Sequence, residues 1–127
     1  MAAGSTRGLL LVLAVLSGAG AVAALALSPD TARAETLIGQ ASYYSHAGRT
    51  ANGEIFRPGD MTAAHRTLPF GARVRVTDIR TRRSIVVRIN DRGPFTRGRI
   101  IDVSHGAAEV LGMTSRGVTA VELEVVN

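Results

Sequence analysis

The chain has 127 residues, 46% of them apolar, and a formal net charge of +5. This length allows at most one domain of ordinary size, and the complete absence of cysteine excludes a disulfide framework and a lipid-modified cysteine. The basic charge would suit an anionic partner. Nucleic acid is not expected, because the only aromatic residues are two Tyr and three Phe, too few to form an interleaved stacking platform.

The N-terminal segment has the pattern of an export signal. Arg7 precedes an apolar run from Leu9 to Leu27, and Ala32-Arg33-Ala34 is a small-x-small cleavage site. We therefore expect residues 1–34 to be a signal peptide and residues 35–127 to be an exported, periplasmic domain. An uncleaved inner-membrane anchor is the alternative, because the run is long enough to span a bilayer.

The rest of the chain alternates short apolar segments with loops rich in Gly, Ser, Thr and Asn. "ARVRVTDI" alternates apolar and polar residues, which is typical of a half-buried strand. "MTAAH" fits a strand or a helix. With that segment included, the patterns predict about six strands, over residues 37–44, 61–65, 72–79, 84–90, 99–104 and 117–126.

A short helix is predicted over residues 104–113, with Ser104 as its N-cap and Gly112 as its stop. Six short strands in so small a domain favour a closed barrel over a sandwich of two sheets. Closure also protects strand edges that a small domain would otherwise expose. The expected fold class is all-β with one or two short helices.

Five motifs occur in an order that is specific to one family. They are "TANGE" (50–54), "TAAH" (62–65), "TLPFG" (67–71), "RINDRGPF" (88–95) and "RIIDVS" (99–104). From about Gly39 to Val126 the chain resembles the RlpA (rare lipoprotein A) family. The resemblance implies a six-stranded double-psi β-barrel. It also implies a lytic transglycosylase that cleaves the MurNAc-GlcNAc β-1,4 bond of peptide-poor peptidoglycan strands and leaves 1,6-anhydroMurNAc ends.

Cleavage of a glycosidic bond needs a proton donor, and carboxyl groups are the usual ones. Resemblance to RlpA points to Glu54, His65 and Asp91 as catalytic residues, whereas the wider fold, which includes expansins and MltA transglycosylases, points to Asp102. The sequence does not rank Asp91 against Asp102.

Each candidate also has a purely structural interpretation. Asp91 could order its Gly-Pro turn. The Asp102 carboxylate could interact favourably with the dipole of the helix that follows it. Glu54 could be an ordinary surface charge, and His65 could be a hydrogen-bonded core histidine.

The candidate glycan contacts are Tyr44, Asn52, Arg92 and Phe95, with packing as the alternative role for each. Arg92 could keep its neighbour Asp91 ionised, or it could bind the lactyl carboxylate of muramic acid. No HxH or HExxH spacing is present, so we expect neither a metal nor another cofactor.

Two alternatives to a transglycosylase remain open: an expansin-like module that binds wall glycan without cleaving it, and a hydrolase that produces reducing ends. We expect a monomer whose partner is peptidoglycan, with cell-envelope or divisome proteins left open as further partners. The sequence departs from the family pattern at Thr81-Arg82, where Asn-Gly is common. Neither residue favours positive φ, which disfavours a type I′ turn there.

Overall fold

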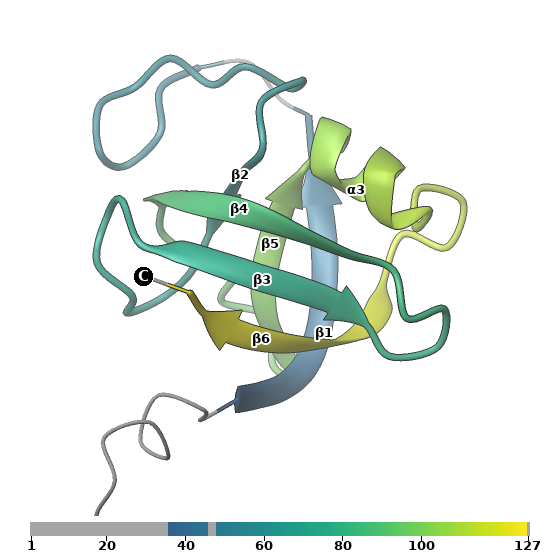
Figure 1. The fold of residues 1–127 in the computed structure, drawn as a ribbon. Coiled ribbons are helices and arrows are strands. Elements are labelled where there is room, and N and C mark those ends of the chain that lie inside the picture. Colours follow the sequence, from purple (N-terminus) through teal and green to yellow (C-terminus); the bar gives the residue numbers. More distant parts are fainter. Residues whose placement is uncertain (1–35, 46–47, 127) are drawn as a thin grey trace, which may run out of the picture. The chain divides into compact units, whose positions relative to one another are not determined.

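The computed structural model describes residues 36–45 and 48–126, so the predicted signal peptide lies outside the described residues. In this part of the chain six strands and one helix follow one another (Figure 1). They are β1 (Thr36–Tyr44), β2 (Thr62–Ala64), β3 (Arg73–Asp78), β4 (Ser84–Asp91), β5 (Arg99–Ser104), α3 (His105–Leu111) and β6 (Thr119–Val125).

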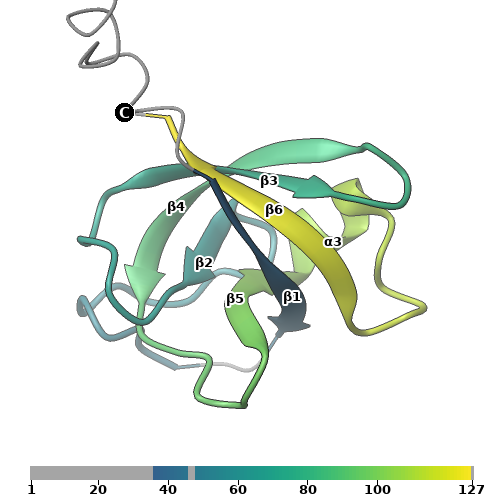
Figure 2. The same cartoon turned by 90° about the horizontal axis from the view of Figure 1, so that it is seen from below.

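The six strands close into one barrel in the order β1-β5-β2-β4-β3-β6, with β6 returning to β1. The pairs β1–β5 and β2–β4 are parallel, and the other four are antiparallel. Figure 2 shows the strands crossing around the common interior. The predicted all-β class and closed six-stranded barrel are confirmed, and all elements of the barrel lie within residues 36–125.

The barrel interior is filled by the apolar positions that alternate along the strands. In β3, Val74 and Val76 are fully buried, whereas Arg73 and Arg75, which alternate with them, are exposed. Successive side chains of a strand point to opposite faces, so this alternation places every second residue in the core. The same rule buries one face of the other strands, contributing Ala41, Ala63, Val87, Ile89, Ile101, Val103, Val121 and Leu123.

The predicted helix caps are both present. The Ser104 hydroxyl accepts a hydrogen bond from the Ala107 backbone N–H at 3.2 Å, and Gly112 adopts φ 71° as the left-handed C-cap. Leu111 on the inner face of α3 is fully buried in the barrel core. No helix among the described residues is long and apolar enough to cross a membrane.

The loop before β2 is fastened to the start of α3. The Gly106 backbone N–H donates to the Pro58 carbonyl at 2.7 Å. A Cβ at Gly106 would lie only 2.9 Å from the Gly59 carbonyl oxygen, so this close approach requires glycine. The contact fixes the C-terminal end of the long loop that carries "TANGE".

The β3–β4 connection contains a left-handed arginine. The Asp78 carbonyl accepts from the Arg82 N–H, and the Asp78 N–H donates to the Arg83 carbonyl, both at 2.8 Å. The loop is therefore longer than a two-residue type I′ turn, as expected from the sequence. Arg82 nevertheless adopts φ 66°, which the sequence disfavoured.

Candidate functional site

Four residues form a row across the outside of the barrel wall. Ser42 of β1 pairs with Asp102 of β5, Asp102 pairs with Ala64 of β2, and Ala64 pairs with Asp91 of β4. Adjacent strands lie about 4.8 Å apart, so the Cα atoms of the two aspartates are about 10 Å apart. The row brings together the two carboxylates that the sequence could not rank.

A β-bulge sets the position of Asp91. In the β2–β4 pair, Ala63 is opposite Ile89 but Ala64 is opposite Asp91, so Asn90 is skipped. The consecutive side chains of Asn90 and Asp91 therefore both reach the "TANGE" loop. Asn90 donates to Glu54 at 3.2 Å, and the Oδ1 atom of Asp91 accepts from the Ala51 backbone N–H at 2.8 Å.

Hydrogen bonds to the Oδ1 atom orient both aspartates. Besides the Ala51 bond, Asp91 Oδ1 accepts from the Arg92 backbone N–H at 2.9 Å. Asp102 Oδ1 accepts from the Ser42 hydroxyl at 2.8 Å. Each of the two residues is partly exposed. The bonds orient the carboxyl groups, and both residues keep part of their surface open to solvent.

Tyr44 lies near both aspartates. Its ring stacks on Phe56 with a centroid distance of 4.7 Å. Burial, together with the negative charges of Asp91 and Asp102, raises the pKa of the Tyr44 phenol well above its ordinary value. The phenol therefore keeps its proton at all physiological pH values.

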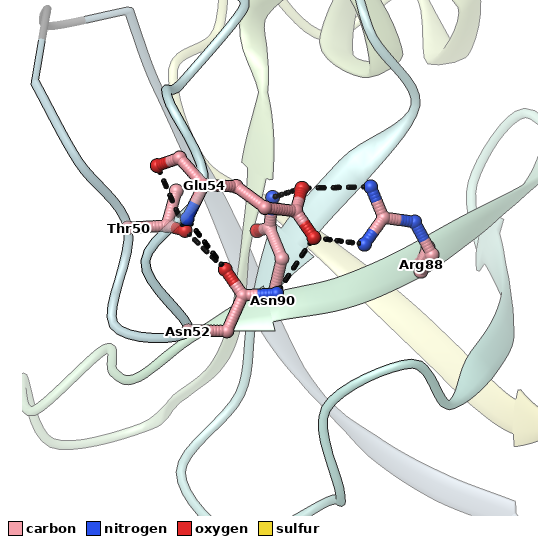
Figure 3. Close-up of polar contacts among 5 residues, drawn as sticks. All are labelled: Thr50, Asn52, Glu54, Arg88 and Asn90. Carbon is pink, nitrogen blue, oxygen red and sulfur yellow. Dashed lines mark hydrogen bonds and ion pairs between the residues drawn. The ribbon is translucent and has the colours of Figure 1, made fainter.

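Glu54 is the centre of a polar cluster that also contains Thr50, Asn52, Arg88 and Asn90 (Figure 3). The Arg88 guanidinium makes a two-point contact with the Glu54 carboxylate at 2.6 and 2.8 Å. The Asn52 side-chain amide donates to Glu54 at 2.6 Å, and the Asn52 Oδ1 accepts from the Thr50 hydroxyl at 2.6 Å.

This cluster fixes the charge of Glu54. Hydrogen bonds from Arg88, and then from Asn52 and Asn90, lower the pKa of Glu54 to about 2. Glu54 is therefore a carboxylate at neutral pH. Its two oxygens are occupied by donors, which suits a residue that orders the "TANGE" loop.

His65 is buried beside the row and caps a turn. Its Nδ1 accepts from the backbone N–H groups of Thr67 and Leu68, each at 3.1 Å. The other ring nitrogen must then carry the proton of the neutral imidazole. Burial, and next the charges of Arg66 and Arg92, lower the pKa of His65. His65 is therefore a neutral histidine at pH 7.

Arg92 ties two loops of the site together. Its Nη1 donates to the carbonyls of His65 and Leu68 at 3.1 and 2.8 Å. The guanidinium also lies 4.0 Å from the centroid of the Phe70 ring, within the range of a cation–π contact. Phe95 has 79% of its surface exposed and follows in the β4–β5 loop.

Four residues that support the site were not among the sequence candidates: Ser42, Thr50, Arg88 and Asn90. The alternation in "RIN" indicates that Arg88 and Asn90 share the face opposite Ile89, which could have identified them as outward partners. Nothing in the sequence pairs Arg88 with Glu54, 34 residues earlier. Among the described residues, no group of three or more His, Asp or Glu side chains could hold a metal ion.

The family model and the curated relatives that match this chain agree with one another. A family model described as lytic transglycolase matches residues 36–123. The "Probable endolytic peptidoglycan transglycosylase RlpA" of Nostoc is 65% identical over 92 residues, which are 68% of this chain and 25% of the relative. The protein of the same name from Synechocystis is 50% identical over 125 residues, which are 88% of this chain and 39% of the relative. The chain thus spans well under half the length of these relatives.

Solved structures show the same fold. The Streptomyces papain inhibitor superimposes with a TM-score of 0.61 at 25% identity, covering 73% of this chain and 96% of the inhibitor. An expansin from Clavibacter michiganensis also gives a TM-score of 0.61, at 20% identity, covering 73% of this chain and 51% of the expansin. Proteins with different names thus share this barrel, so function has to be argued from the site.

Proposed function

Because this chain belongs to the lytic transglycolase family, we propose that it cleaves the MurNAc-GlcNAc β-1,4 bond of peptidoglycan glycan strands and leaves 1,6-anhydroMurNAc ends. The similar proteins of Nostoc and Synechocystis carry the name of that activity. The observation that carries the proposal is the row in which Asp91 and Asp102 flank Ala64 on the outside of the barrel.

The reaction needs one proton delivered and one removed. A carboxylic acid donates its proton to the O4 atom of the leaving GlcNAc as the glycosidic C–O bond breaks. The 6-hydroxyl of MurNAc attacks its own anomeric carbon, and its proton passes to a carboxylate. No water is consumed. Asp91 and Asp102 supply two such groups on one face, so they can divide the two transfers or one of them can perform both in turn.

Glu54 is a positioning residue in this proposal. A carboxyl group whose pKa is about 2 holds almost no proton at neutral pH, so it is a poor general acid. Its contact with Arg88 holds the "TANGE" loop against the end of β4. From this loop the Ala51 N–H reaches Asp91. Loss of Glu54 would therefore act on the reaction through the orientation of Asp91.

The remaining sequence candidates are proposed to shape the glycan site. Phe95 offers an exposed ring on which a sugar can stack. The Tyr44 hydroxyl is buried near both aspartates, so Tyr44 would support the site from beneath, and Asn52 lies in the loop beside Asp91. Arg92 is committed to loop carbonyls through Nη1, so its contribution to glycan binding would come from its other nitrogen atoms.

The proposed substrate also sets the expected location. Peptidoglycan lies outside the cytoplasm, which agrees with the export signal expected in residues 1–34. We propose a periplasmic protein that acts on peptide-poor strands as a monomer, with cell-envelope or divisome proteins as further partners.

A digest tests the activity. Residues 35–127 are incubated with glycan strands from which an amidase has removed the stem peptides, and the products are read by mass spectrometry. The expected products carry 1,6-anhydroMurNAc ends, and the Asp91→Asn/Asp102→Asn double variant yields none. Reducing ends in place of anhydro ends would identify a hydrolase. Glycan binding without any new ends, from the folded protein, would identify a non-catalytic expansin-like module.

A further inference from the structure

The end of the barrel away from the candidate site carries a cluster of arginines. The connection from β3 to β4, residues 79–83, contains Arg80, Arg82 and Arg83, and all three are exposed. We call these five residues the basic tip. In the part of the chain that the structure describes, no carboxylate forms an ion pair with any of the three. The Arg83 guanidinium packs against Gly112, the C-cap of α3, whereas Arg80 and Arg82 present their charges to solvent without an ion pair within the described residues.

The backbone of the basic tip is held rigidly by a buried carboxylate. Asp78 is fully buried, and its Oδ1 accepts from the N–H groups of Arg80 and Thr81 at 2.9 and 3.2 Å. Its Oδ2 accepts from Arg116 at 2.9 Å and from Thr119 at 3.0 Å. Arg116 thus neutralises Asp78, so Asp78 does not compensate the charges of Arg80 and Arg82.

Arg82 occupies a backbone conformation that does not favour arginine. Its φ is 66°, and it is the non-glycine residue with positive φ among those described. Glycine or asparagine would adopt this conformation with less strain than arginine. No contact within the described fold explains an arginine at this position. We therefore look for the role of Arg82 in its exposed positive charge.

The basic tip and the candidate site lie at opposite ends of β4 (Figure 1). The tip precedes Ser84, at the start of this strand, and Asp91 is its last residue. At about 3.3 Å per residue, the strand separates the two by about 23 Å. A surface bound at the tip would leave the row of aspartates accessible to a different ligand.

We propose that the basic tip is a docking surface for an anionic phospholipid bilayer. Guanidinium groups match the geometry of phosphate oxygens, and each basic residue near an anionic membrane contributes on the order of fivefold in affinity. Ile79 adds an apolar side chain, 37% exposed, beside the arginines. An apolar side chain next to cations suits a bilayer interface, which offers both headgroups and acyl chains. A carboxylate-bearing glycan offers no apolar phase for Ile79.

Vesicle sedimentation tests the docking surface. The self-contained barrel, residues 35–127, is mixed with phosphatidylcholine vesicles with and without phosphatidylglycerol. We expect binding only to vesicles that contain phosphatidylglycerol, with loss of binding as salt is raised. The Arg80→Gln/Arg82→Asn variant should bind about 30-fold more weakly. Asparagine tolerates positive φ, so the melting temperature of the variant should not fall.

The control is Arg57→Gln/Arg97→Gln, which removes the same charge from exposed positions outside the tip. It should retain most of the binding. Equal loss in both variants would show that only net charge matters and would overturn the proposal, as would equal binding to both vesicle types. Binding to isolated peptidoglycan through the tip, without vesicle binding, would assign the surface to the wall polymer instead. The tip variant should still cleave soluble glycan, so this test is independent of the proposed activity.

Discussion

Asp91 and Asp102 flank the same residue, Ala64, from the two strands that pair with β2. They are 11 positions apart in the sequence, and the "RGPFTRG" loop and the start of β5 lie between them. Their carboxylates are oriented by different donors, two backbone N–H groups for Asp91 and the Ser42 hydroxyl for Asp102. The two groups are therefore not equivalent, and single substitutions can separate their roles.

The aspartate that donates the proton should be identified by its amide variant. Asparagine preserves the size of the side chain and the acceptor oxygen, so Asp91→Asn and Asp102→Asn should both fold. Loss of general acid catalysis should lower kcat by about 10²–10⁴-fold in one of them. Initial rates of anhydro-end formation measure the effect. Ser42→Ala is the matched control for orientation alone, and we expect a smaller loss from it. Rates within tenfold of wild type in both amide variants would contradict the assignment.

Glu54 should remain ionised throughout the neutral and mildly acidic range. Its folded pKa, about 2, lies below its ordinary value of 4.5, because Arg88, Asn52 and Asn90 bind the charged form. The stability this gives the "TANGE" loop is present above pH 4.5 and is lost as the pH falls toward 2. Carbon-13 NMR titration of the Glu54 carboxyl group should therefore show its midpoint well below pH 4.5.

The matched variant is Arg88→Gln, which removes the first of these donors and should move the midpoint of Glu54 upward. A Glu54 midpoint at or above its ordinary value in the wild-type protein would contradict the positioning role. The pH–rate profile should show no inflection from Glu54 near neutral pH.

Two substitutions distinguish a structural from a catalytic role for His65. Asparagine can place an acceptor oxygen near the position of Nδ1 and so retain the bonds from Thr67 and Leu68. Glutamine reaches the position of the other ring nitrogen instead. If His65 caps the turn, His65→Asn should keep most of the melting temperature and the activity, whereas His65→Gln should lose both. Loss of activity in a fully stable His65→Asn variant would show that the imidazole takes part in the reaction.

The pKa of His65 gives a further test. Because burial and the charges of Arg66 and Arg92 lower this pKa, the folded protein disfavours the protonated ring. The contribution of neutral His65 to stability is complete above pH 6.5 and declines as the pH falls below it. Proton NMR should show the His65 ring titrating below pH 6.5, and a midpoint above that value would contradict this environment.

Asp78→Ala should strongly destabilise the barrel. The carboxylate is fully buried and accepts from Arg116, Thr119 and two backbone N–H groups. Although burial alone would raise the pKa of Asp78, these donors together hold it below its ordinary value. Removing one partner of a buried pair costs about 3–5 kcal/mol. Urea unfolding of the variant measures the loss. Asp78→Asn, which keeps an acceptor, should lose less, and equal stability of all three proteins would contradict the prediction.

The strands and the helix were predictable because their signals are local. Val74 and Val76 alternate with exposed arginines in β3, and Ser104 and Gly112 mark the ends of α3, as the structure confirms. The segment that became β2 was ambiguous, since three residues carry too little periodicity to choose a type. Its pairing with β4 and β5 makes it a strand, and that pairing comes from closure of the barrel.

The site was predictable only in part. Motif resemblance selected Glu54, His65, Asp91 and Asp102, but not their partners. Arg88 and Glu54 are 34 residues apart, and no local pattern joins them. The bulge that aligns Asp91 rather than Asn90 with Ala64 is likewise invisible in "RIND", because it depends on the register of a separate strand.

The sequence by itself determined the class of the domain, the face of each strand that enters the core, the ends of the helix and the family. These follow from the period of the apolar residues, from capping residues and from motifs, all of which act over a few neighbouring positions. Only the tertiary structure decided the charge state of Glu54, the tautomer of His65 and the row that joins Asp91 to Asp102. Hydrogen bonds and charges act through space, so these properties were set when barrel closure brought distant segments together.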